Sequence, residues 1–173
     1  LLGVKDATFE VGSMDRGELF VSMEVFEWAL NCKWEIIAVY GPADHRRSEA
    51  FLDELRRKVA AAQLPIVVGG DFNLIRSVED KNNNLVNFPR MQMFNDCIAD
   101  MGLRELDRVG PRFTWANRQV EPTRSVLDRV FASPEWNIRC PLASLQAIMR
   151  IGSNHIPLLL SLENERPPLS PRF

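Results

Sequence analysis

An acidic residue and an amide residue follow a short apolar run at residues 66–68, Ile-Val-Val, which is typical of a strand buried on both faces. Gly70 allows a tight turn, so Asp71 would project from the end of a rigid strand into the loops, where functional sites usually form. Asn73 lies two residues further on and would face the same way in an extended chain. A carboxylate that accepts a proton beside an amide that donates hydrogen bonds could hold a water next to a phosphate. An Asx-rich turn after a strand is the alternative.

Two more polar residues lie at or within strand-like runs in the second half of the chain. His155 comes just before an apolar strand, where an imidazole can donate to a developing negative charge or move a proton. Asp128 lies inside an apolar run, and a carboxylate at an inner position needs a partner such as a histidine. The alternatives are a histidine bonded to backbone at a strand end, and a surface pair of Asp128 with Arg129.

Arginine and tyrosine supply candidate contacts to phosphate. Residues 90–173 hold 11 basic groups, all arginine, against 9 acidic ones, whereas residues 1–89 hold 10 and 14. The planar guanidinium can bind two phosphate oxygens at once. Tyr40 ends a strand-like run and could present its hydroxyl to a phosphate, or pack in the core. Three arginines in loops beside a short strand are expected to contact nucleic acid, with solvated surface residues as the alternative: Arg112, Arg118 and Arg124.

The elements that would position these residues are many strands and two helices. Apolar periodicity predicts helices over residues 46–63 and 89–101, with Asn87 capping the start of the second and Gly102 its end. A turn is expected over residues 12–17. Strands are expected at residues 7–11, 19–26, 34–40, 66–68, 113–116, 126–132, 142–147 and 156–162. The mixture predicts an α/β sandwich formed by one domain over residues 1–165, followed by an extended proline-rich tail over 166–173.

Composition excludes several classes of protein. The 173 residues are 46% hydrophobic and 25% charged, which is ordinary for a globular domain and excludes disorder as the main state. The net charge of −2 argues against a strongly basic nucleic-acid coat, and no apolar run is long enough to span a bilayer. Three scattered cysteines indicate free buried thiols and a reducing intracellular compartment, nucleus or cytoplasm. With only two histidines, the sequence argues against a zinc site of clustered histidines and cysteines.

The motifs together, in this order, resemble the endonuclease/exonuclease/phosphatase superfamily, which includes the DNase I-like nucleases. More closely, the chain resembles the endonuclease region of plant non-LTR (LINE-type) retroelements. The chain opens on Leu1, and we expect it to be processed or a piece of a longer protein. The resembling segments are residues 39–42, 69–73, 79–81, 113–115, 127–129, 133–136 and 153–157.

This resemblance implies a four-layer αββα sandwich of two mixed β-sheets flanked by helices. It also implies hydrolysis of phosphate esters with Mg²⁺ or Mn²⁺, DNA as a partner, no membrane and no small organic cofactor. By resemblance, Asp71 binds metal and orients or deprotonates the attacking water, while Asn73 holds the phosphate. His155 stabilises the charged transition state, Asp128 orients His155, and Tyr40 contacts the phosphate or the metal-site network.

Two departures from the family pattern bear on activity. The family's Ser-Asp-His reads Ser153-Asn154-His155 here, so Asn154 offers a metal one neutral oxygen and no negative charge. The family's first strand, which contains an asparagine, and the glutamate that is its main metal ligand have no counterpart. A chain that begins near the family's third strand is expected to have an open sheet edge, through which it could self-associate.

Three functional hypotheses follow. The first is a metal-dependent DNA endonuclease of retroelement origin. The second is a relative that keeps the fold and binds nucleic acid or protein without cutting. The third is a phosphatase of the same superfamily. It ranks last, because residues 113–115 and 127–129 resemble the retroelement branch more than the phosphatase branches.

Overall fold

The computed structural model describes residues 9–148 and 152–162. The strands of this part of the chain form two mixed sheets and one two-stranded ladder. In the six-stranded sheet only β3 and β4 are parallel neighbours. Its strands, in spatial order, are β1 (Phe9–Arg16), β2 (Phe20–Glu27), β3 (Cys32–Tyr40), β4 (Ile66–Asp71), β9 (Asp128–Ala132) and β5 (Arg104–Glu105).

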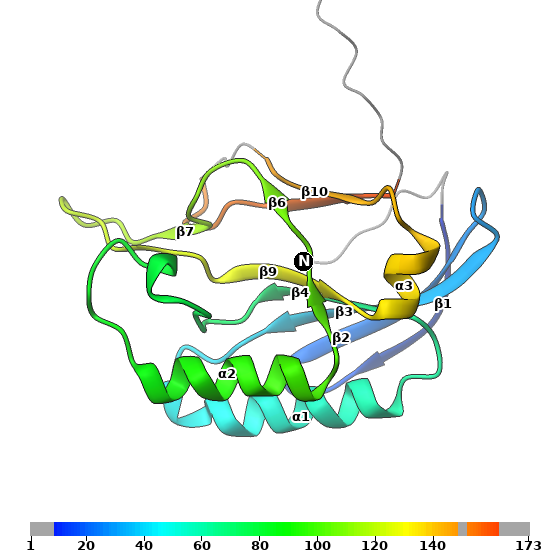
Figure 1. Cartoon of the computed structure of the whole chain (residues 1–173), viewed down its shortest axis with the longest axis horizontal. Coiled ribbons are helices and arrows are strands. Elements are labelled where there is room, and N and C mark those ends of the chain that lie inside the picture. The colour runs from blue at the N-terminus through cyan, green and yellow to red at the C-terminus, as the bar shows by residue number, and fades with distance from the viewer. Residues whose placement is uncertain (1–8, 149–151, 163–173) are drawn as a thin grey trace, which may run out of the picture.

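The second sheet is smaller and is also mixed, because β10 pairs antiparallel with β11 and parallel with β6. A separate two-stranded ladder extends from the body of the molecule (Figure 1). The three strands of the second sheet, in spatial order, are β11 (Leu158–Ser161), β10 (Ser144–Ala147) and β6 (Arg108–Val109). The ladder consists of β7 (Trp115–Ala116) and β8 (Arg124–Ser125).

Helices cover one face of the six-stranded sheet, and the smaller sheet faces its other side (Figure 1). The two long helices lie side by side on the outer face. Within the described residues, no helix combines the length and apolarity needed to cross a lipid bilayer. The helices are η1 (His45–Arg47), α1 (Ser48–Ala61), η2 (Val78–Asp80), α2 (Phe88–Asp100) and α3 (Pro134–Arg139).

The two long helices form where the apolar periodicity predicts them. On α1, Phe51 and Leu55 are buried against the sheet. At the start of α2 the Asn87 side chain accepts a hydrogen bond from the Arg90 amide, and Gly102 follows the helix with a φ of 63°. The predicted cap and the predicted stop are therefore confirmed.

Aromatic clusters fill the cores on both faces of the six-stranded sheet. Beneath the helices, the Phe72 ring lies 5.2 Å from the ring of Phe94 and 5.3 Å from that of Phe131. Between the sheets, the rings of Trp34 and Trp136 are 5.6 Å apart. Because β4 contributes to both cores, its run of Ile-Val-Val is buried on both faces, as predicted.

Some predicted boundaries are wrong. Residues 12–16 are strand rather than turn, since β1 runs to Arg16 and accommodates an irregularity between Val11 and Met14 without leaving its partner. The short helix α3, whose first turn is capped by Ser133, was not predicted, and neither were the two-residue strands β5, β6 and β8. The predicted tail at residues 166–173 lies outside the described residues.

Four strands lie at the edges of the two described sheets. β1 and β5 border the larger sheet, and β11 and β6 border the smaller one. The edge at β1, the first described strand, is an open edge of the kind expected from the sequence. Leu159 on β11 is 47% exposed and the strand carries no charge. Self-association through such an edge stays a prediction.

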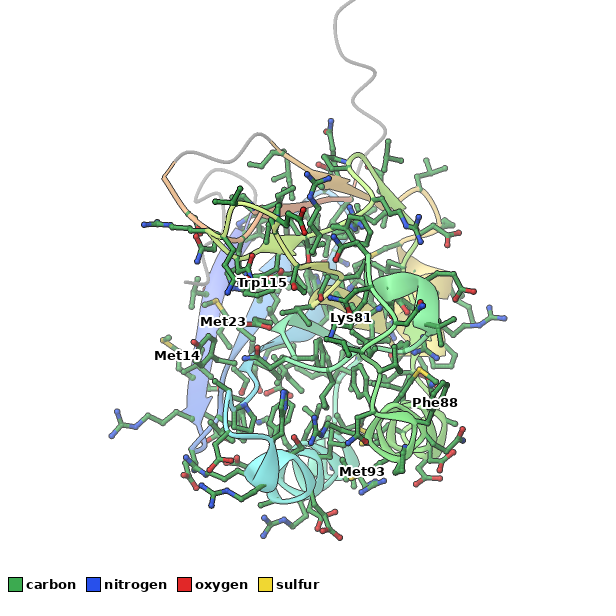
Figure 2. The ribbon with its side chains drawn as sticks, turned by 90° about the vertical axis from the view of Figure 1, so that its left-hand side faces the viewer. Met14, Met23, Lys81, Phe88, Met93 and Trp115 are labelled. Carbon is green, nitrogen blue, oxygen red and sulfur yellow. The ribbon has the colours of Figure 1, made fainter. Side chains whose placement is uncertain are left out.

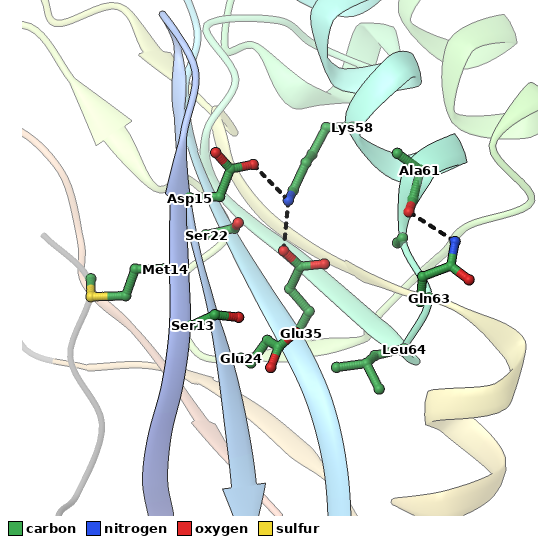
Figure 3. A pocket seen from close by; sticks show the side chains of 11 residues that line it. Ser13, Met14, Asp15, Ser22, Glu24, Glu35, Lys58, Ala61, Gln63 and Leu64 are labelled. Carbon is green, nitrogen blue, oxygen red and sulfur yellow. Dashed lines mark hydrogen bonds and ion pairs between the residues drawn. The ribbon is translucent and has the colours of Figure 1, made fainter.

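An ion-pair bridge fastens α1 to the outer face of the larger sheet. The Lys58 ammonium lies 2.8 Å from Glu35 and 3.0 Å from Asp15, beside a polar cavity of about 180 Å³ (Figure 3). Burial opposes the charge of Lys58, but the hydrogen bonds to Glu35 and Asp15 outweigh it and raise the pKa of Lys58. This bridge holds the last turn of α1 against β1 and β3.

We predict that Gly70→Ala destabilises the fold by at least about 2 kcal/mol. Gly70 has a φ of 143°, and a Cβ there would lie 2.2 Å from the carbonyl oxygen of Val39 on the neighbouring strand. Gly102→Ala is the matched control, because Gly102 also has a positive φ but nothing lies within 4 Å of an added Cβ. Urea unfolding of both variants tests this, and equal losses for the two would contradict it.

Candidate active site

Two carboxylates face each other where β4 and β9 reach the loops. The antiparallel register of these strands pairs Asp71 with Asp128, so their side chains lie on the same face of the sheet. His155 joins them from the segment before β11, which an isolated bridge to Trp115 holds in place. One ligand-type atom from each of Asp71, Asp128 and His155 lies within 4.8 Å of the others. Residues far apart in the sequence therefore meet in one cluster, as expected.

The imidazole of His155 is oriented by Asp128. Its Nδ1 lies 2.9 Å and 3.1 Å from the two carboxylate oxygens of Asp128, and its backbone amide donates to the Ser153 hydroxyl. The histidine ring is therefore bonded to a carboxylate. Arg129 points away and is only 6% exposed, so a surface pair with Asp128 is excluded.

Asp71 is the buried carboxylate of the cluster. Its Oδ2 lies 3.7 Å from Nε2 of His155, and its Oδ1 accepts a hydrogen bond from the Asn73 amide. Burial, helped by the negative charge of Asp128, raises the pKa of Asp71 to about 6, although the Asn73 amide and His155 act in the opposite direction. A carboxylate with this pKa is a better proton acceptor than an ordinary aspartate once it is ionised.

Asn73 meets Asp71 through a turn and not along an extended strand. It has a left-handed φ of 52°, and its side-chain nitrogen Nδ2 donates to the carbonyl of Gly41 at 2.7 Å and to Oδ2 of Asp71 at 3.3 Å, in addition to the backbone N–H bond to Oδ1. The Asn73 side chain therefore fastens the end of β4 to the segment after β3. Its predicted contact with phosphate stays a prediction.

The remaining predicted residues lie around the cluster at different places. Tyr40, the register partner of Asp71 on β3, is 65% exposed and so is not a core residue. Arg118 donates to the side-chain oxygen of Asn154 at 2.9 Å, next to His155. Arg112 stacks on Phe113 and bonds the carbonyl of Glu79, and the exposed Arg124 lies on β8. Of these three arginines, Arg118 alone is bonded to the part of the His155 segment that the structure describes.

The donor set of the cluster suits a divalent cation. Two carboxylates are hard oxygen ligands, and the repulsion between Asp71 and Asp128 is the kind that a cation relieves. Among the described residues, no glutamate belongs to the cluster. Asn154 is engaged by Arg118 at its side-chain oxygen, so its predicted contact with a metal stays a prediction.

Thr114, which the sequence analysis did not single out, connects the chain segments that carry the cluster. It is fully buried, and its hydroxyl oxygen accepts hydrogen bonds from the amides of Leu127 and Asp128, both at 3.0 Å. Its carbonyl accepts a hydrogen bond from Ile156 at 2.7 Å. One residue thus fixes the backbone on both sides of the Asp128–His155 contact. The signals in the sequence were a polar residue between two aromatics, Phe113 and Trp115, and its place in a segment that carries the resemblance.

A buried ion-pair network holds the neighbouring turn. Arg129 bonds the carboxylates of Asp80 and Glu105, and Asp80 also accepts hydrogen bonds from the amides of Arg76 and Ser77 at 2.7 Å and 3.0 Å. Because these residues come from η2, β5 and β9, the network locks the η2 turn against the sheet.

We predict that Thr114→Val costs about 2–4 kcal/mol of stability, because it leaves two buried amides without an acceptor in a side chain of the same shape. Thr114→Ser keeps the acceptor and is expected to lose less than about 1.5 kcal/mol. Urea denaturation of both variants measures the difference. Indistinguishable midpoints for the two would show that the hydroxyl does not hold the site.

We predict that Asp71 makes stability depend on pH. The pKa of Asp71 is about 6 when folded against 3.8 otherwise, so the folded chain binds this proton more tightly. The stabilisation is present below pH 3.8 and is lost as the pH rises to about 6, a change of up to about 3 kcal/mol. With EDTA present, the free energy of unfolding of the wild type minus that of Asp71→Asn should therefore fall between pH 3.5 and pH 7. A flat or rising difference would contradict this.

Comparisons with known proteins agree with this architecture. A family described as Endonuclease-reverse transcriptase matches residues 34–159, and no curated protein matches the chain. The endonuclease domain of TRAS1, a telomere-specific non-LTR retrotransposon, superposes with a TM-score of 0.68 at 15% identity, over 88% of this chain and 68% of that one.

Two phosphatases have the same architecture. The 3′ phosphatase NExo from Neisseria, bound to a product DNA hairpin, has a TM-score of 0.62 at 14% identity, over 85% of this chain and 65% of that one. The mannosyl-6-phosphatase Bt3783 from Bacteroides thetaiotaomicron has a TM-score of 0.57 at 12% identity, over 90% and 67%. The chain thus spans about two thirds of these structures, and at such identities they show the fold, which is DNase I-like. With the family match over most of its length, the chain belongs to the endonuclease–reverse transcriptase family of the endonuclease/exonuclease/phosphatase superfamily.

Proposed function

We propose that this chain is a divalent-metal-dependent phosphodiesterase domain of retroelement origin that cuts DNA. The observation that carries the proposal is the cluster in which His155, oriented by Asp128, lies beside the buried Asp71. The family description and the retrotransposon domain of TRAS1 support a retroelement source, and the DNA-bound NExo supports a nucleic-acid substrate. A plant lineage and an intracellular, reducing location stay predictions from the sequence.

Asp71 and Asp128 would hold the cation, Mg²⁺ or Mn²⁺, because both offer carboxylate oxygens at one end of the sheet. When bound, a divalent cation polarises a phosphate and makes its bound water more acidic. Asp71, once ionised, accepts a proton from the attacking water, and burial tunes it for that task.

His155 would act on the phosphate. Its Nδ1 is committed to Asp128, so the ring presents Nε2 toward the space beside Asp71. A protonated Nε2 there donates to a phosphate oxygen on which negative charge develops. Tyr40, exposed at the end of β3, has a hydroxyl free to reach the same phosphate. Asn73 holds the turn that places Asp71.

A second candidate function is nucleic-acid binding without cleavage. It is favoured by Asn154, which replaces the family's aspartate and whose side-chain oxygen accepts a hydrogen bond from Arg118. A site with one carboxylate fewer holds a cation less tightly. The fold and the binding surface could then persist after hydrolysis is lost.

A plasmid-nicking assay with Mg²⁺ or Mn²⁺ tests the first proposal. We expect nicking that EDTA abolishes and that Asp71→Ala reduces by at least about a hundredfold, whereas Asp96→Ala, which removes an exposed carboxylate of α2, has no effect. A soluble phosphate monoester run alongside identifies a phosphatase by turnover of the ester without nicking.

Asn154→Asp separates the two candidate functions. Nicking only by Asn154→Asp would support the site and place the defect at one missing carboxylate. If neither the wild type nor Asn154→Asp nicks the plasmid, and both have the circular-dichroism spectrum of a folded protein, the nuclease proposal is contradicted and binding without cleavage is supported.

A further inference from the structure

A series of paired chain segments connects the active site to an exposed group of residues, which we call the ledge. His155 pairs with Trp115, Trp115 with Ser125, and Ser125 with Lys81. Neighbouring strands lie about 4.8 Å apart, so the backbone of Lys81 is about 14 Å from that of His155. Figure 2 shows this end of the molecule, with Lys81 between Trp115 and Phe88. The ledge is defined as Lys81, Leu85, Phe88 and Arg90, and these pairings connect it through Lys81 to the segment that carries His155.

Hydrogen bonds hold the loop of this ledge in place. The Lys81 ammonium donates to the carbonyl of Leu85 at 2.8 Å. Asn82 donates to the carbonyl of Pro122 at 2.8 Å and accepts a hydrogen bond from the Arg124 amide at 2.9 Å. The loop is thus fixed to the β7–β8 ladder and does not need to be ordered when a ligand binds.

The ledge exposes apolar side chains that the core does not use. Phe88 begins α2 and is 60% exposed, whereas the buried residues of that helix lie further along it. Leu85 is 78% exposed. An exposed aromatic ring on a rigid helix end is a surface on which an unpaired base can stack.

Two cations belong to the same stretch of chain as these apolar groups, Lys81 before them and Arg90 in the first turn of α2. Among the described residues, neither Lys81 nor Arg90 forms an ion pair with a carboxylate, so both charges are available to a ligand. Both charges act on His45, whose pKa is lowered first by burial and then by Arg90 and Lys81. An exposed aromatic ring complements an unpaired base, and cations without carboxylate partners in the same segment complement the phosphates that flank it.

We propose that this ledge binds a single-stranded flank of the nucleic acid, with a base stacked on Phe88 and phosphates held by Lys81 and Arg90. The inference rests on the proposed function, since it assigns the substrate of that site a single-stranded segment next to the bond to be cut. Duplex DNA fits less well, because its bases are stacked on one another and do not reach an aromatic side chain.

Binding without cleavage tests this proposal. Fluorescence anisotropy in EDTA measures the affinity for a labelled single-stranded 12-nucleotide DNA and for a duplex of the same length. Phe88→Ala should weaken single-strand binding by roughly five- to a hundredfold and leave duplex binding within about twofold. Trp28→Ala is the matched control, because Trp28 is 59% exposed in the β2–β3 turn, at the other end of the sheet.

Salt dependence tests the two cations. Replacing Lys81 and Arg90 together by alanine should reduce the slope of log affinity against log salt by about 1.4 for the single strand, and Arg57→Ala on α1 should leave it unchanged. Equal losses for single strand and duplex in Phe88→Ala, or an unchanged slope in the double variant, would overturn the proposal. Because EDTA is present throughout, these results do not depend on whether the chain cuts DNA.

Discussion

The candidate site depends on the antiparallel pairing of β4 with β9. Their register places Asp71 opposite Asp128, and two carboxylates this close on a largely buried face repel each other. The fold tolerates this because His155 bonds one carboxylate and the pKa of the other rises. A site that retains such repulsion is poised to gain from a proton or a cation. The cores on both faces of the sheet hold the two strands in that register.

The chain changes sheets at the same place. β8 belongs to the two-stranded ladder and β9 to the large sheet, so the backbone between them leaves one pairing partner before it meets the next. Amides at such a junction need acceptors, and the Thr114 hydroxyl supplies two of these bonds. On the other flank, Arg129 draws Asp80 and Glu105 together. Side-chain hydrogen bonds and ion pairs therefore hold the backbone at this junction, where regular strand pairing holds it elsewhere in the molecule.

Residue type and position at strand ends marked Asp71, Asp128 and His155 as candidates but left ordinary structural alternatives open for each, and it was the order of the motifs along the chain, through the resemblance, that predicted their association. The helices were also predictable, because apolar periodicity and capping residues are local signals. The roles of Thr114 and Lys81 were not predictable, although both lie in segments that carry the resemblance, since these roles arise from pairing with segments 13 and 44 residues away. The predicted turn at residues 12–17 failed for a similar reason: pairing with β2 keeps that stretch in the sheet despite its glycines.

The burial of the three cysteines has a practical consequence for labelling. Cys32, Cys97 and Cys140 are each at most 5% exposed, and burial raises the pKa of the Cys97 and Cys140 thiols to about 11. Thiol-directed reagents act on exposed thiolates, so they have little to modify in the native chain. A cysteine introduced at Val120, which is fully exposed at the tip of the β7–β8 ladder, would be a single attachment point for a spectroscopic probe.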